Sequence, residues 1–123
     1  MNAWRIRRYV LDDRGEPRPE PNFLRWVKWC RHGQDSLVVA SDLIEGGLTV
    51  YQVMTRFLPY DQGEEGQRPI LFATNFLAHR GPLIKLAGEG YSTRTEAIIG
   101  HHDAIESLKS FQIGAELLLE GQS

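Results

Sequence analysis

The chain has 123 residues, of which 41% are hydrophobic and 24% charged, and its formal net charge is -2. This length suits one domain around one core, and the apolar content is too high for a wholly disordered chain. The near-neutral charge excludes a global attraction to nucleic acid or to an anionic membrane. We predict a single domain over residues 1–123, with residues 1–8 and 114–123 as flexible or peripheral ends.

The cellular location follows from three features. Cys30 is the one cysteine, so no intrachain disulfide forms and a reducing compartment fits best. The basic residues near the start are not followed by the apolar stretch of a signal peptide. No apolar run approaches the ~18 residues that cross a bilayer. We expect a cytoplasmic protein without a membrane partner.

The first third predicts a strand, a connector and a helix. Residues 9–11 form a short apolar run that ends in a turn at 12–15. Residues 16–21 alternate proline with other residues, which favours a stiff extended connector. Asn22 is a good helix N-cap, and apolar residues then recur at spacings of three and four, so we expect a helix over about 22–32.

The remainder predicts strands followed by a second helix. Strands are expected over 37–40, 48–58, 70–77 and 83–86, joined by a glycine hairpin at 46–47, a polar loop at 59–68 and a turn at 81–82. A Thr93–Glu96 capping box begins a helix over about 93–110, and Gly100 within it suggests a close approach of another element. The fold class is α+β, with an antiparallel sheet of three to five strands and both helices packed on one face. The other face would be free.

Few residues indicate catalysis. His101 and His102 are adjacent, and neighbouring helical side chains point about 100° apart, so they do not chelate one metal unaided. We expect His101 to be a buried, hydrogen-bonded histidine and His102 a surface residue. Cys30 falls on the apolar face of the first helix and is interpreted as a core residue. No catalytic residue, metal ligand or cofactor is assigned.

The charge distribution favours one alternative function. Residues 1–31 hold eight basic and four acidic side chains, whereas the remainder holds six basic and twelve acidic ones. Arg25, Lys28 and Arg31 lie on one side of the first helix beside Trp29, an arrangement that could hold a phosphate backbone with an aromatic stack. Nucleic-acid binding is therefore an alternative, although a solvated surface explains the same residues.

Several short motifs resemble a family of short uncharacterised proteins encoded in tailed-phage genomes and bacterial chromosomes. They are Tyr9–Asp12, Gly15–Pro17, Trp26 with Trp29, Pro69–Thr74, Tyr91–Thr93, Glu96–Ala97 and Gly100–His101. The chain departs from that family at Leu58–Pro59, where an Asp-His pair is common, and at Ala73, where Glu is common. The resemblance implies a phage or prophage setting in a bacterial cytoplasm and no inherited catalysis.

The leading hypothesis is a non-enzymatic accessory protein that acts by protein–protein interaction, for example by modulating a host factor. Trp29, Tyr51 and Phe57 are the candidate anchors, because aromatic side chains dominate interface energies. The alternatives are the nucleic-acid module and a small metal-dependent enzyme around His101 and His102. A homodimer through Leu117–Leu119 or an edge strand is compatible with all three.

Overall fold

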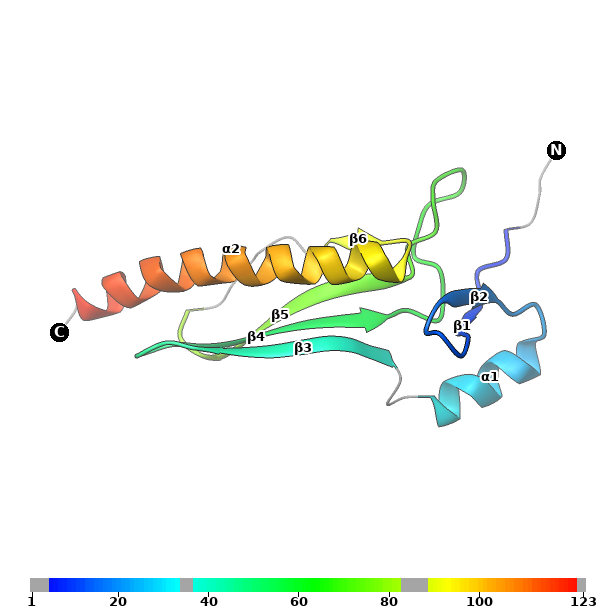
Figure 1. The fold of residues 1–123 in the computed structure, drawn as a ribbon, viewed down its shortest axis with the longest axis horizontal. Helices are drawn as coiled ribbons and strands as arrows, with labels where there is room; N and C mark the ends of the chain where they lie inside the picture. The colour runs from blue at the N-terminus through cyan, green and yellow to red at the C-terminus, as the bar shows by residue number, and fades with distance from the viewer. Residues whose placement is uncertain (1–4, 34–36, 83–88, 122–123) are drawn as a thin grey trace.

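The computed structural model describes residues 5–33, 37–82 and 89–121. They form β1 (Tyr9–Leu11), β2 (Pro17–Pro19), α1 (Phe23–His32), β3 (Val38–Glu45), β4 (Val50–Phe57), β5 (Phe72–Arg80), β6 (Gly90–Tyr91) and α2 (Arg94–Glu120). β3, β4, β5 and β6 make an antiparallel sheet in that order, and β1 pairs with β2 in a separate hairpin. The predicted α+β class with an antiparallel sheet is confirmed (Figure 1). The strand expected at 83–86 lies outside the described residues.

The alternating burial of β4 defines the two faces of the sheet. Tyr51, Val53, Thr55 and Phe57 are each at most 1% exposed and face α2. The residues between them point to the opposite face, because successive strand side chains alternate. Register follows the same rule, since Thr55 stands directly opposite Thr74 on β5.

Helix α2 lies along one face of the sheet (Figure 1). Thr93 caps it as expected, because its hydroxyl accepts a hydrogen bond from the Glu96 backbone at 3.2 Å. The helix runs to Glu120, about ten residues beyond the predicted end near 110. Gln112 is buried and donates to the Ile44 carbonyl at 3.2 Å. Docking of this kind on the β3–β4 hairpin outweighs the low helix propensity of Gly114.

The β1–β2 hairpin and α1 lie together at one end of the sheet (Figure 1). The proline-rich connector is extended as expected, but residues 17–19 also pair with β1, a pairing that the prolines did not suggest. Helix α1 begins after Asn22, whose side chain accepts from the Arg25 backbone at 3.0 Å. Trp29 on α1 packs edge-on against Phe57, with ring centroids 5.8 Å apart.

The hydrophobic core between α2 and the sheet has two clusters. One is built on Phe57, Leu71, Phe72 and Ala97. The other is built on Tyr51, Val53 and Leu108. Thr55 and Thr74 occupy the strand positions between them, and His101 occupies the corresponding turn of α2. A polar layer therefore divides the core.

Candidate functional site

The polar layer is a continuous chain of hydrogen bonds that crosses the sheet beneath α2. Asp42 on β3 lies 2.7 Å from Nε2 of His101, and Nδ1 of His101 lies 2.7 Å from the Thr55 hydroxyl. Thr55 lies 2.7 Å from the Thr74 hydroxyl on β5. His101 is 2% exposed, whereas the Asp42 side chain is 50% exposed. The chain thus starts at solvent and continues through buried groups.

The direction of these bonds follows from the chemistry of the groups. A carboxylate only accepts, so Nε2 of His101 carries the proton that faces Asp42. In the neutral ring Nδ1 then accepts the proton of Thr55. Thr55 has no second proton and must accept from Thr74. With the ring neutral, every proton in the chain points from the cleft side toward Asp42, whereas a protonated ring reverses the bonds of Thr55 and Thr74.

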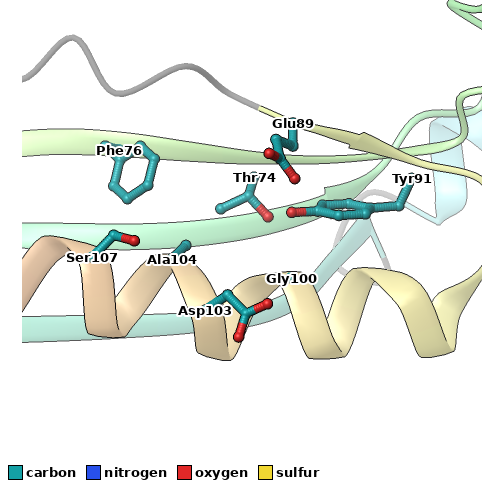
Figure 2. A pocket seen from close by; sticks show the side chains of 8 residues that line it. All are labelled: Thr74, Phe76, Glu89, Tyr91, Gly100, Asp103, Ala104 and Ser107. Atoms are coloured by element: carbon teal, nitrogen blue, oxygen red, sulfur yellow. The ribbon is translucent and has the colours of Figure 1, made fainter.

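Thr74 is also a wall of a cleft between α2 and strands β5 and β6. The cleft has a volume of about 230 Å³. Figure 2 shows the Glu89 carboxylate and the Thr74 and Tyr91 hydroxyls gathered on one side. Phe76 and Ala104 add apolar surface. Two further polar side chains, Asp103 and Ser107, come from α2 and complete the lining.

Gly100 sets the distance between α2 and the Tyr91 ring. A Cβ atom at this position would overlap the phenol, which confirms the close approach expected from the sequence. Burial raises the pKa of Tyr91, and the negative charge of Glu89 raises it further. Tyr91 therefore stays a neutral phenol, and its hydroxyl lies beside Thr74 and Glu89 (Figure 2).

A second buried polar group, Asp61, holds the chain start against the loop after β4. Its carboxylate is 2.5 Å from Nη2 of Arg5, and it accepts backbone hydrogen bonds from Gly63 at 2.7 Å and Ile70 at 2.9 Å. Burial raises the pKa of Asp61, but these bonds outweigh burial and leave that pKa below its usual value. The contacts are internal, which indicates a structural role.

The predicted aromatic anchors are mostly unavailable to a partner. Tyr51 is 0% and Phe57 1% exposed, so the expectation of exposed anchors is wrong for both. Both lie on the β4 face that α2 covers, where their rings fill the core. Trp29 is half-buried against Phe57.

The predicted basic stripe and the histidine pair lie in different places. Arg25, Lys28 and Arg31 are exposed on α1, so the nucleic-acid alternative keeps its residues. Arg5 and Arg7 of the same basic third are instead engaged with Asp61 and its loop. His101 is buried and bonded at both ring nitrogens while His102 is exposed, as expected.

Metal binding and thiol chemistry find no support within ranges 5–33, 37–82 and 89–121. No group of three His, Cys, Asp or Glu side chains there could hold a metal ion. Cys30 is partly buried, and burial raises the pKa of its thiol. A raised pKa disfavours the nucleophilic thiolate, in agreement with a packing role for this residue.

The sheet face opposite α2 is uncovered by the helices that the structure describes (Figure 1). Leu43 and Leu77, each 54% exposed, flank Gln52 on neighbouring strands. Gln52 bonds to Ser41 at 2.9 Å and to His79 at 2.9 Å, so a polar row crosses three strands. We call this surface the open sheet face; its members are Ser41, Leu43, Glu45, Val50, Gln52, Met54, Arg56, Ala73, Asn75, Leu77, His79 and Arg80.

The comparisons with known proteins return no family model, no curated protein and no solved structure that matches this chain. The resemblance to the phage-encoded family therefore stays a prediction. Within the part of the chain that the structure describes, no helix has both the length and the apolar character to span a membrane.

Proposed function

We propose that the chain is a non-enzymatic accessory protein that binds another protein through the open sheet face. The observation that supports the proposal best is the pair Leu43 and Leu77, which are each 54% exposed on the sheet face that α2 does not cover. Half-exposed leucines rimmed by polar groups are typical of interaction surfaces. A phage or prophage setting is part of the proposal and rests on the motif resemblance alone.

The charges of the face favour one kind of partner. Arg56 is exposed beside Ala73, and Arg80 is exposed opposite Val50. Neither arginine has an ion-pair partner among the described residues, and the face carries one acid, Glu45. The complementary surface is a protein patch with an apolar centre and acidic groups at its margin.

The test is affinity capture from a lysate of the source organism, repeated with matched surface variants. Leu43→Ser with Leu77→Ser removes the apolar centre, and Arg56→Glu with Arg80→Glu reverses the rim charge. Ile99→Ser with Leu117→Ser is the control, because these α2 residues are comparably exposed, at 57% and 64%. All three double variants should keep the wild-type unfolding free energy within about 1 kcal/mol.

The proposal requires one protein that wild type and control capture, that both open-face variants lose, and that dissociates more readily at high salt. Equal capture by all variants would contradict it. Loss of capture after nuclease treatment would favour nucleic acid bound at Arg25, Lys28 and Arg31. A homodimer that Leu43→Ser with Leu77→Ser dissociates would show that a second copy occupies this face, and would also overturn the proposal.

A further inference from the structure

The cleft beside α2 is rich in negative charge. Glu89 enters it just before β6, and Asp103 enters it from α2. Neither carboxylate has an ion-pair partner in the described ranges. Two carboxylates that line one cleft, one beside β6 and one on α2, create a local potential that attracts a cation.

Thr74, one of three hydroxyl-bearing residues that line the cleft, is already engaged with Thr55. With the His101 ring neutral, the chain that ends at Asp42 commits the Thr74 proton to Thr55. The Tyr91 hydroxyl lies beside Thr74 and the Glu89 carboxylate (Figure 2), and a carboxylate can only accept. The phenol oxygen of Tyr91 and the carboxylates of Glu89 and Asp103 are therefore left as acceptors. A ligand that completes this set must bring several hydrogen-bond donors.

The apolar part of the cleft lining bears on the size and apolar character of the ligand. Phe76 from β5 and Ala104 from α2 lie in the same cleft as the acids, and its volume of about 230 Å³ admits a small organic molecule. The face of an aromatic ring also attracts a cation. No trio of metal-ligating side chains is present in the described residues, which favours an organic donor over a bare metal ion.

We propose that this cleft binds a small organic cation, an ammonium or guanidinium group on a short apolar stem. The cationic head lies among Glu89, Asp103 and the Tyr91 hydroxyl, and the stem lies on Phe76 and Ala104. The polar chain to Asp42 fixes the Thr74 hydroxyl, so the acceptor geometry is set before the ligand arrives.

The experiment titrates the ¹⁵N-labelled chain with n-butylamine and with guanidinium ion, and follows the amide signals of Gly100 and Ala104 by NMR. n-Butanol is the neutral control, because it shares the stem and lacks the charge. Glu89→Gln and Asp103→Asn each remove one carboxylate from the cleft. Glu65→Gln is the matched control variant, because it removes the same charge from an exposed loop residue outside the cleft.

The proposal requires saturable shifts with a cation, none with n-butanol, and unchanged binding in Glu65→Gln. Glu89→Gln and Asp103→Asn should each weaken binding about three- to tenfold. Absence of saturable shifts with both cations, equal shifts with n-butanol, or unchanged affinity in both cleft variants would overturn it. The cleft and the open sheet face lie on opposite sides of the sheet, so failure here leaves the proposed function standing.

Discussion

The polar layer yields the sharpest test of the structure, because removing His101 alone should destabilise the fold more than removing its three buried members together. His101→Leu replaces the imidazole with an apolar side chain of similar size and thereby deletes both ring nitrogens. It therefore breaks the bond to Asp42 and leaves the Thr55 hydroxyl without its acceptor. Thr55 is 0% exposed, so water cannot replace that acceptor without opening the core.

The magnitude is the sum of two losses. The bond to Asp42 involves a charged acceptor, but Asp42 is 50% exposed and solvent weakens the interaction to about 1 kcal/mol. A buried hydroxyl left without its partner costs about 1–3 kcal/mol. The free energy of unfolding of His101→Leu should therefore fall by about 2–4 kcal/mol relative to wild type.

The triple variant His101→Leu, Thr55→Val, Thr74→Val removes the unsatisfied hydroxyls together with the histidine. Replacing the three buried partners by apolar groups of similar shape is close to neutral, and Asp42, which is 50% exposed, stays hydrated. The free energy of unfolding of the triple variant should therefore lie within about 1 kcal/mol of wild type. Guanidinium chloride titration followed by tryptophan fluorescence measures both variants. A triple variant at least as unstable as His101→Leu would refute the claim that the layer is held by its mutual hydrogen bonds.

Two further tests concern single contacts. Gly100→Ala would place Cβ 2.5 Å from Cε1 of Tyr91. Despite alanine's better helix propensity, the substitution should lower the free energy of unfolding by about 1–3 kcal/mol, which a lower melting temperature would report. Gly114→Ala on the same helix meets no atom within 4 Å and should raise stability by about 0.5–1 kcal/mol; the same sign for both would contradict the placement of Tyr91. Asp61→Asn should cost about 2–3 kcal/mol at neutral pH, because the carboxylate loses its charged bond to Arg5. The pKa of Asp61 is lowered in the folded state, so its contribution to stability is complete above the unfolded pKa near 4 and is lost as pH falls through the folded pKa. The difference in unfolding free energy between wild type and Asp61→Asn should therefore narrow from neutral to acid pH. A difference that stays constant with pH would contradict this role of the Asp61 carboxylate.

Local signals in the sequence predict the start of each helix well. Asn22 and the Thr93–Glu96 capping box both have short-range hydrogen-bond patterns, and both caps form as expected. The length of α2 could not be found in this way. Its last ten residues are held by long-range bonds, such as those from Leu48 to Glu116 at 2.7 and 2.8 Å, which no local pattern indicates.

The error over Tyr51 and Phe57 has a physical source. Strand alternation places both on one side of β4, but Val50 and Met54 on the other side are also apolar. Because both faces of the strand look hydrophobic, periodicity alone cannot decide which one the helix covers. The answer depends on α2, which is distant in sequence: its His101 bonds to Thr55 of β4 across 46 positions.

The polar layer could not be predicted at all, because its members come from four elements. No local pattern marks the three strand residues, Asp42, Thr55 and Thr74. The sequence identifies His101 only as a histidine on an apolar helix face. The layer exists because the strand register sets Thr55 opposite Thr74 and α2 places His101 above them. Information of this kind resides in tertiary pairing, not in any single segment.

The central strand β4 makes the two proposed surfaces independently testable. Gln52 points to the open sheet face, whereas Thr55 on the same strand points under α2 into the polar layer. Side-chain substitutions on one face leave the backbone pairing of β4 with its neighbours intact. Leu43→Ser with Leu77→Ser should therefore leave cation binding in the cleft unchanged, and Glu89→Gln should leave protein capture unchanged. If either variant affected both readouts, the sheet would have to transmit a backbone rearrangement, and neither surface could be treated as a separate site.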